Sequence, residues 1–265
     1  IFEFTVFYEG IPQGAENPPW AGGFTWSKDK NGRDWIAVSC EGEGARIWWP
    51  NKDHITAEGD SVRMAYTVPS NLVAVGNGKL RSVKNLGEKT TYEWFVSNPI
   101  NNYNISVQIG NYVTVQDTFL KDNETHFMNH YVLDYNSELA SNFFPQSKEV
   151  IRFYEKYFGD YQWYEDGYKL IEVPYLGMEH QSAVTYGNGF SMYNGVRSKS
   201  WPMYGVIDPL IIHETGHEWF GNSVTASDPT HIWIHEGLQV YSESLYFEDK
   251  FDSYEVGVHY LNTIK

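Results

Sequence analysis

Short runs of alternating apolar and polar residues fill the first part of the chain. These runs occupy residues 35–38, 62–68, 72–75, 92–96 and 105–109. Alternation with a period of two residues is typical of strands that bury one face, and turns with Gly, Pro and Asn separate the runs. The pattern predicts an all-β domain over residues 1–115, arranged as an antiparallel saddle or sandwich.

Beyond residue 116 the apolar positions follow the period of a helix instead. In residues 147–157, four apolar or aromatic side chains fall on one helical face: Val150, Ile151, Tyr154 and Tyr157. Three more elements are predicted, two helices and one strand: 210–220, 232–247 and 169–173. Residues 116–265 are therefore predicted as a second, mixed domain, and the fold class of the chain as α+β.

The two ends of the chain have an unusual pattern. Residues 1–8 alternate like a strand but are not preceded by an initiator Met, and the sequence stops at Lys265 without a Gly or Pro that would end a helix. We expect a strand at residues 1–8, and we interpret both ends as positions within a longer protein.

Composition narrows the classes of function. The chain has 265 residues, of which 17% are aromatic, and this content favours a packed globular protein over a disordered one. Its formal net charge of −15 opposes binding to nucleic acid and to anionic lipid. No run approaches the ~20 apolar residues of a membrane span. Cys40 is the single cysteine, so an internal disulfide framework is excluded.

Residues 208–221 have the signals of a complete helix. Asp208 is a favourable N-cap, Pro209 suits the first helical position, and Gly221 suits the residue just past the end. Within this helix His213 and His217 are four residues apart, so both rings project from one face, where a single zinc ion can bind both.

Two acidic residues complete the pattern of a hydrolytic metal site. Glu214, beside His213, lies where metal-assisted hydrolysis needs a general base. Glu236 follows His217 after eighteen intervening residues and begins the next predicted helix, so it can be the third ligand of an open zinc site. Glu243 is a rival ligand or a residue that orients one of the ligand histidines. Two other histidines are interpreted as loop or surface residues: His231 and His235.

At these residues the sequence resembles the M1 family of zinc aminopeptidases, whose signature is His-Glu-x-x-His, eighteen residues, then Glu. Residues 176–180 stand where this family has Gly-x-Met-Glu-Asn, and residues 219–222 are also similar to the family. Residues 39–46 resemble the strand segment that delivers a Gln or Glu from the β-domain into the active site. The resemblance covers nearly the whole chain and implies a thermolysin-like (gluzincin) domain that binds one Zn²⁺ through three residues: His213, His217 and Glu236.

The resemblance also implies roles for the remaining site residues. Glu214 acts as the general base, Glu179 and Glu41 hold the α-ammonium of the substrate, and the main chain of Gly177 and Met178 aligns the substrate backbone. Glu43 is an alternative to Glu41, because strand alternation places both on the same face. The motif alignment favours Glu41.

The sequence also departs from the family pattern. Four residues differ from the family motifs: Leu176, His180, His235 and Leu238. None is an inferred zinc ligand, and we expect them to change the first specificity pocket. The family's oxyanion-stabilising Tyr is expected beyond Lys265, so that these 265 residues alone are expected to be nearly inactive. Four tyrosines after Glu236 are interpreted as packing residues: Tyr241, Tyr246, Tyr254 and Tyr260.

These inferences together predict a zinc-dependent aminopeptidase that acts on peptides with a free N-terminus, with no nucleic-acid partner and no membrane span. Three alternatives stay open: a zinc endopeptidase, a bifunctional relative that also opens a lipid epoxide, and a non-catalytic scaffold of the same fold. Exported bacterial relatives have a segment similar to residues 48–53, which favours an extracytoplasmic bacterial enzyme.

Overall fold

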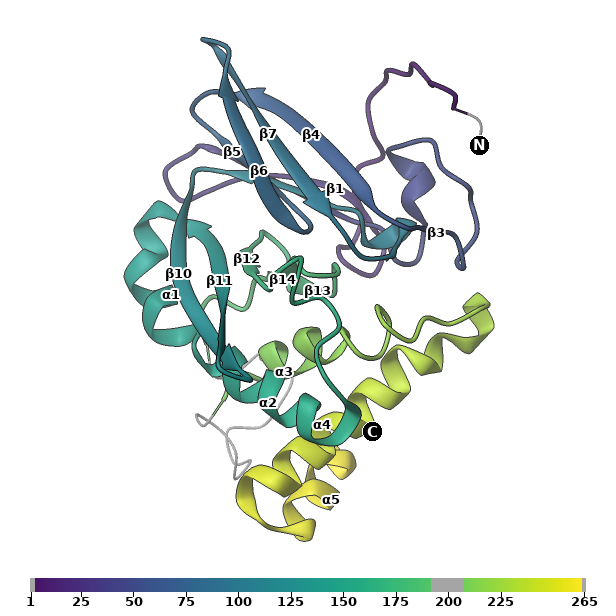
Figure 1. Ribbon diagram of the computed structural model, residues 1–265, viewed down its shortest axis with the longest axis vertical. Coiled ribbons are helices and arrows are strands. Elements are labelled where there is room, and N and C mark those ends of the chain that lie inside the picture. The colour runs from purple at the N-terminus through teal and green to yellow at the C-terminus, as the bar shows by residue number, and fades with distance from the viewer. Residues whose placement is uncertain (1–2, 192–206, 264–265) are drawn as a thin grey trace.

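The computed structural model describes residues 3–191 and 207–263 of the chain. In Figure 1 strands β4 to β7 lie at the top, the helices α2 to α5 lie in the lower half, and the short strands β12 to β14 lie between them. The architecture is mixed α+β, as the sequence pattern predicts.

Three antiparallel sheets form the β-rich part. The largest has the order β1 (Gly23–Lys28), β2 (Asp34–Ser39), β9 (Val107–Gly110) and β5 (Val73–Gly76). The second has the order β4 (Val62–Pro69), β7 (Lys89–Val96) and β6 (Lys79–Asn85). The third pairs β3 (Glu58–Gly59) with β8 (Ile100–Asn101). In β4, Met64 and Val68 are buried and their neighbours are exposed, because alternate side chains point to opposite faces.

The N-terminal prediction is wrong. Residues 1–2 lie outside the described part of the chain, and residues 3–8 belong to no strand. Their alternating side chains pack into no core, since Phe7 is 93% exposed. An alternating pattern predicts a strand only where one face is buried against other elements.

A mixed five-stranded sheet connects the β-rich part to the helices. Its order is β10 (Tyr112–Lys121), β11 (Glu124–Leu133), β12 (Leu170–Glu172), β14 (Val184–Tyr186) and β13 (Gly177–Met178). The pairs β11–β12 and β12–β14 are parallel. All three residues of β12 are buried, as expected for a central strand with both faces covered. The short strand β13 forms the edge of this sheet.

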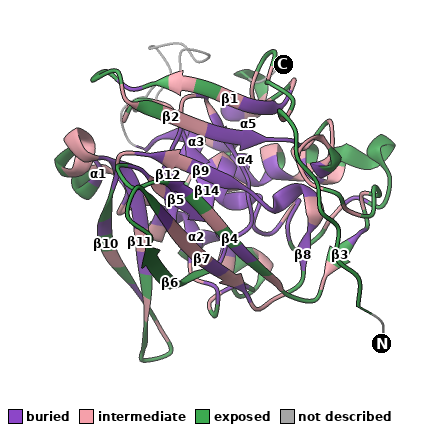
Figure 2. Cartoon of the chain, turned by 90° about the horizontal axis from the view of Figure 1, so that it is seen from above, coloured by how far each residue is buried: buried purple, intermediate pink, exposed green. Residues whose placement is uncertain are grey.

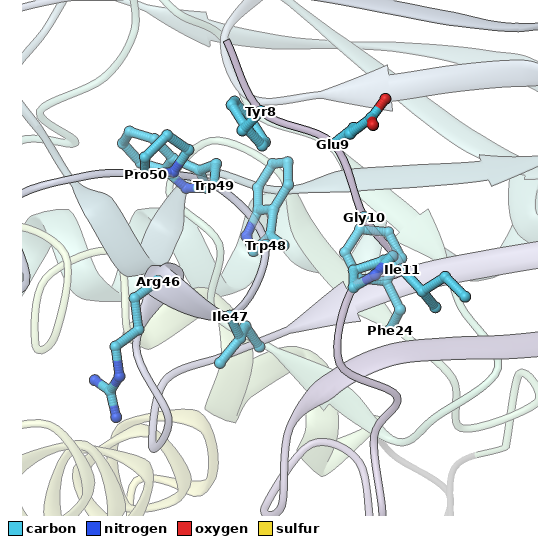
Figure 3. Close-up of a pocket in the computed structure, with 11 residues that line it drawn as sticks. Tyr8, Glu9, Gly10, Ile11, Phe24, Arg46, Ile47, Trp48, Trp49 and Pro50 are labelled. Carbon is cyan, nitrogen blue, oxygen red and sulfur yellow. The ribbon is translucent and has the colours of Figure 1, made fainter. Parts of the chain in front are cut away.

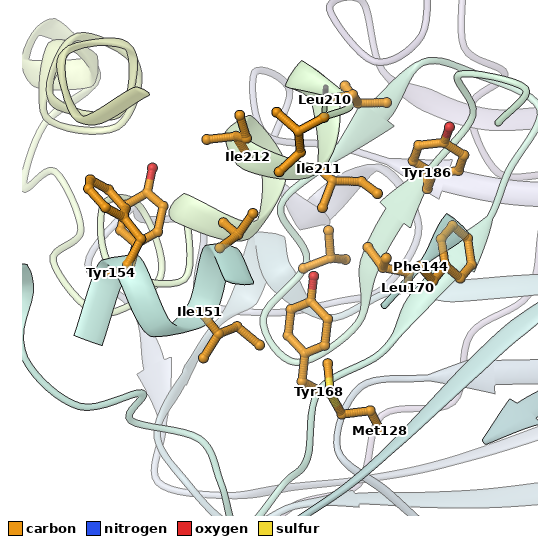
Figure 4. Close-up of a cluster of buried hydrophobic side chains, with 14 of the residues drawn as sticks. Met128, Phe144, Ile151, Tyr154, Tyr168, Leu170, Tyr186, Leu210, Ile211 and Ile212 are labelled. Atoms are coloured by element: carbon orange, nitrogen blue, oxygen red, sulfur yellow. The ribbon is translucent and has the colours of Figure 1, made fainter. Parts of the chain in front are cut away.

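The helices pack on a core of aromatic and branched side chains (Figure 4). They are α1 (Ser137–Phe143), α2 (Gln146–Phe158), α3 (Pro209–Gly216), α4 (Glu236–Phe251) and α5 (Tyr254–Thr263). Ile151 and Tyr154 of α2 are fully buried, as the helical period predicts. Tyr157 is 47% exposed, against the prediction, because its hydroxyl donates to Asp249 of α4 at the helix surface.

Buried polar contacts join the β-rich part to the sheet around β12. Lys169 Nζ donates to the main-chain oxygens of Gly78 and Ser182, and Asn77 Nδ2 donates to the main-chain oxygen of Gln181. Figure 2 shows the buried residues gathered centrally, around β9, β12, β14 and α3. The two parts therefore share one interior. Among the described residues, no helix is long and apolar enough to cross a membrane.

Candidate metal centre

Helix α3 positions the two ligand histidines. Asp208 caps it by accepting from the main-chain N–H of Leu210 at 2.9 Å, as the sequence predicts. The helix ends at Gly216 rather than near residue 220, and His217 is its C-cap. A side chain at Gly216 is impossible without rearrangement, because its Cβ would lie 2.1 Å from the hydroxyl oxygen of Tyr154 on α2. Close packing of α2 on α3 thus fixes the last turn of α3, directly before His217.

Three ligand-type side chains converge at the end of α3. His213 Nε2 lies 3.2 Å from His217 Nε2 and 3.5 Å from Glu236 Oε2, and His217 Nε2 lies 3.8 Å from Glu236 Oε1. Glu236 is the first residue of α4, as the motif predicts, although the predicted helix began at residue 232, where the chain forms the 3₁₀ helix Pro229–Ile234 instead. Nitrogens and an oxygen within 4.8 Å of one another are close enough to bind one ion at distances of about 2 Å.

The opposite nitrogen of each histidine has its own acceptor. His213 Nδ1 lies 2.6 Å from Glu243 Oε1, and His217 Nδ1 lies 2.8 Å from the main-chain oxygen of Phe220. Each acceptor holds a hydrogen on Nδ1, so the lone pair is on Nε2 and faces the other ligands. Glu243 therefore contacts a ligand histidine and does not join the ligand group, in agreement with the orienting role expected of it.

Glu214 and Glu179 lie next to these ligands. Their carboxylate oxygens and a ring nitrogen of His217 fall within 4.8 Å of one another. Gly177 of β13 covers the Glu214 side chain so closely that a Cβ there would lie 2.7 Å from Oε1. Asn222 Nδ2 donates to the main-chain oxygen of Glu179 at 2.8 Å and fixes that segment. The backbone of residues 177–179 thus lies directly beside the metal-type ligands.

Glu41 reaches the same place from the β-rich part. Strand β2 ends at Ser39 and residues 41–43 form a turn, so residues 39–46 are not the strand segment that the resemblance implies, and Glu41 and Glu43 do not share a strand face. Glu41 lines the cavity at the metal centre, whereas the carboxylate of Glu43 lies against the backbone of Gly22. The turn therefore places Glu41 at the cavity and Glu43 away from it, a difference that strand alternation did not predict.

The prediction for His235 is wrong, because this histidine is fully buried. Its Nδ1 lies 3.0 Å from Glu41 Oε1, and its ring stacks on Tyr103 at a centroid distance of 6.0 Å. The Tyr103 hydroxyl donates to Glu179 Oε1 at 3.4 Å. Glu41 is separated from His235 by 194 positions, so no local sequence signal could show this contact.

A cavity of about 630 Å³ joins the three ligand-type side chains to the carboxylates of Glu41, Glu179 and Glu214. Its lining includes Trp20, which sequence analysis missed and which is 68% exposed. Leu176 also lines the cavity, whereas His180 lies elsewhere, with Nε2 3.0 Å from the main-chain oxygen of Val38. A separate cavity of about 590 Å³, between the N-terminal segment and residues 46–50, shares no lining residue with it (Figure 3).

The cavity is strongly acidic. Burial and the nearby Glu41 carboxylate raise the pKa of Glu179 to about 7, and burial and Glu236 raise the pKa of Glu41 to about 7. Burial also raises the pKa of Glu214 well above its ordinary value, although His213 opposes this. Crowded, buried carboxylates of this kind are stabilised by positively charged groups. The site therefore suits cations.

The four tyrosines after Glu236 differ in burial. Tyr246 and Tyr260 are buried packing residues, as predicted. Tyr241 and Tyr254 are 52% and 72% exposed, so that interpretation is wrong for both. They lie on the outer faces of α4 and α5, where nothing covers them among the described residues.

The fold and the grouping of ligand-type side chains are similar to those of metallopeptidases, and comparison with known proteins shows which family the chain resembles. Residues 142–264 match the peptidase family M1 domain. Residues 142–264, slightly less than half of the chain, are therefore a peptidase family M1 domain, and similarity to M1 aminopeptidases extends over most of the chain.

Curated relatives agree with this assignment. The chain is 22% identical over 204 residues to aminopeptidase M1-D of Oryza sativa subsp. japonica, covering 76% of the chain and 23% of the relative. It is 24% identical over 254 residues to glutamyl aminopeptidase of Rattus norvegicus, covering 92% of the chain and 26% of the relative. The chain thus spans about a quarter of the length of these relatives.

Solved structures show the same fold. An M1 zinc metallopeptidase from Deinococcus radiodurans has a TM-score of 0.72 at 19% identity, covering 91% of this chain and 51% of that chain. A two-domain M1 zinc metallopeptidase mutant bound to L-tryptophan has a TM-score of 0.71 at 19% identity, over 91% of this chain and 52% of that chain. The chain matches about half of each solved structure.

Proposed function

We propose that this protein is a zinc-dependent aminopeptidase, which hydrolyses the first peptide bond of peptides with a free N-terminus. The observation that supports it most directly is the position of two carboxylates, Glu41 and Glu179, beside a group of three metal-type ligands in one cavity.

The ligand set fits zinc. Two imidazole nitrogens with fixed lone pairs and one carboxylate are a common catalytic zinc set. His213, His217 and Glu236 would hold the ion. Bound there, zinc supplies Lewis acidity, which polarises a carbonyl oxygen and makes water a better nucleophile.

Glu214 is the proposed general base. It is buried, and Gly177 limits the positions that its carboxylate can take. Its raised pKa favours uptake of the proton from the attacking water and its later transfer to the leaving amine. One carboxylate therefore serves both proton transfers.

Glu41 and Glu179 are the proposed amine anchors. Their nearest carboxylate oxygens lie within 4.8 Å of each other, and an ammonium hydrogen bonds at about 2.8 Å, so one ammonium can bridge both. The carbonyl carbon of the first residue is only two bonds from that nitrogen, about 2.5 Å away. An anchored amine thus places the first peptide bond, and no later one, beside Glu214 and His217.

The backbone of β13 is proposed to align the rest of the peptide. Gly177 and Met178 form the edge strand of the five-stranded sheet and line the same cavity. An extended peptide can add to such an edge through main-chain hydrogen bonds. This arrangement accepts many side chains, because it reads the backbone.

The test uses a Glu214→Gln variant of the full-length protein. We expect about one zinc per chain in the native protein and in the variant, and a loss of at least 100-fold in turnover of aminoacyl 4-nitroanilides. Zinc binding without turnover in the native protein would favour the non-catalytic scaffold. Equal rates on free and N-acetylated peptides would favour the endopeptidase.

A further inference from the structure

The hydrogen bonds of His235 define its tautomer. The main-chain N–H of Ala226 points at Nε2 from 3.0 Å. A main-chain N–H can only donate, so Nε2 must be the nitrogen with the lone pair. The ring hydrogen is therefore on Nδ1, which lies 3.0 Å from Glu41 Oε1. His235 donates to the carboxylate of Glu41.

The ring of His235 has little freedom to move. It is fully buried and stacks on Tyr103 with an interplanar angle of 24°. The hydroxyl of Tyr103 in turn donates to the carboxylate of Glu179. A stacked pair of rings thus donates one hydrogen bond to each of the two carboxylates that face the cavity.

The same geometry decides against a second metal ion. Ligand-type atoms of Glu41, Glu179 and His235 lie within 4.8 Å of one another, which resembles a metal site. With hydrogen on Nδ1 and Nε2 accepting from Ala226, however, the ring has no lone pair to offer. A neutral donor also leaves the negative charge of Glu41 in place, which an ammonium needs.

We propose that His235 is a positioning residue, whose Nδ1–H holds Glu41 at the separation from Glu179 at which both carboxylates share one primary ammonium. This inference rests on the proposed function, since it needs Glu41 and Glu179 to bind the amine. It makes recognition of the free N-terminus depend on the residue directly before Glu236. The amine site and the metal site are therefore fixed by adjacent residues of one chain segment.

Two substitutions test separately the hydrogen bond that His235 donates to Glu41 and the one that it accepts from Ala226. In His235→Asn the amide nitrogen reaches the position of Nδ1 and can still donate to Glu41. In His235→Gln the longer amide reaches the position of Nε2, so its oxygen can still accept from Ala226 but the donor to Glu41 is lost. Both variants remove the ring, so a purely structural role would affect them alike.

Steady-state kinetics on a free tripeptide and its N-acetylated form supply the readout. We expect His235→Gln to raise KM for the free peptide about tenfold and to reduce the preference for the free form by a similar factor, with a smaller effect on kcat. We expect His235→Asn to restore KM to within about threefold of the native value. His231→Gln, at an exposed histidine on the preceding 3₁₀ helix Pro229–Ile234, is the matched control and should match the native protein.

Three results would overturn the inference. They are an equal rise in KM for the Asn and Gln variants, a native KM in the Gln variant, and two zinc ions per native chain with His235 needed for the second. Each differs from failure of the proposed function, which would appear as native protein that binds zinc but cleaves no free peptide.

Discussion

Nδ1 of His213 lies 2.6 Å from Oε1 of Glu243, so helices α3 and α4 meet through a hydrogen bond directly behind the metal-type ligands. Glu243 is only 1% exposed. Burial alone lowers the pKa of His213, but the charge of Glu243 and the hydrogen bond with Glu236 outweigh it and raise this pKa well above its ordinary value, so a metal ion that binds Nε2 must displace a proton. The ring orientation is thus set by a buried carboxylate.

Glu243→Gln should weaken metal binding. The amide keeps the shape of the carboxylate but removes the charge that makes the ring a stronger ligand, and losses of roughly 10–100-fold are typical for such partners. Competition for zinc with a chromophoric chelator measures this affinity. Glu255→Gln, at an exposed acid of α5, is the control. Native affinity in the Glu243 variant would show that the contact does not tune the ligand.

Gly177→Ala should impair turnover and spare metal binding. The added Cβ would lie 2.7 Å from Glu214 Oε1, so the carboxylate must shift, and shifts near 1 Å can cost about 100-fold in rate. Measuring kcat and bound zinc separates the two effects. Gly14→Ala is the control, since its nearest atom would be 3.9 Å away. A native kcat would argue against a fixed position for Glu214.

Glu179→Gln should weaken binding of free amines. It removes one charged acceptor, and such hydrogen bonds contribute about 2 kcal/mol, so KM for a free peptide should rise about 30-fold. An N-acetylated peptide should show no comparable change, because it has no ammonium to lose. If both peptides were affected equally, Glu179 would be a structural residue and not an amine anchor.

Stability should fall as the pH decreases below 6.5, partly through His130. Burial lowers the pKa of His130 to about 3, an effect that Asp117 opposes and that Lys148 and Lys169 reinforce. Between about pH 3 and pH 6.5 the unfolded chain therefore binds the extra proton, so stability rises with pH in this window. The contribution is about 1.4 kcal/mol for each pH unit within the window.

The variant His130→Asn isolates this contribution. Its amide oxygen can replace Nδ1 as the acceptor for the main-chain N–H of Leu170, and it does not titrate. Denaturant unfolding at pH 4, 5, 6 and 7 should give the variant a shallower loss of stability toward low pH than the native protein. Parallel curves for the two proteins would contradict the assignment.

Much of the site could be predicted because its signals are local. The cap at Asp208 and the spacing of His213 and His217 depend on one helix, and Glu236 begins the next one. The family motifs supplied what spacing alone could not, namely the selection of Glu179 and of Glu41.

What could not be predicted depends on contacts between distant parts of the chain. Burial of His235 depends on Glu41 and Tyr103, and the exposure of Trp20 at the cavity depends on how the turn before β1 packs. Tyr157 shares a helical face with buried residues of α2, but its side chain lies at the surface beside Asp249. A periodic pattern alone does not show which residues of a helix are covered by neighbouring elements.

Glu41 is supplied by the turn after β2, whereas the metal-type ligands come from α3, from its C-cap residue His217 and from α4. In the proposed aminopeptidase, the amine anchor Glu41 and the metal ligands therefore come from different segments, which meet through the hydrogen bond of Glu41 with His235, directly before Glu236. If this protein is the proposed aminopeptidase, substitutions in residues 40–44 are expected to change the binding of amino groups without replacing a metal-type ligand.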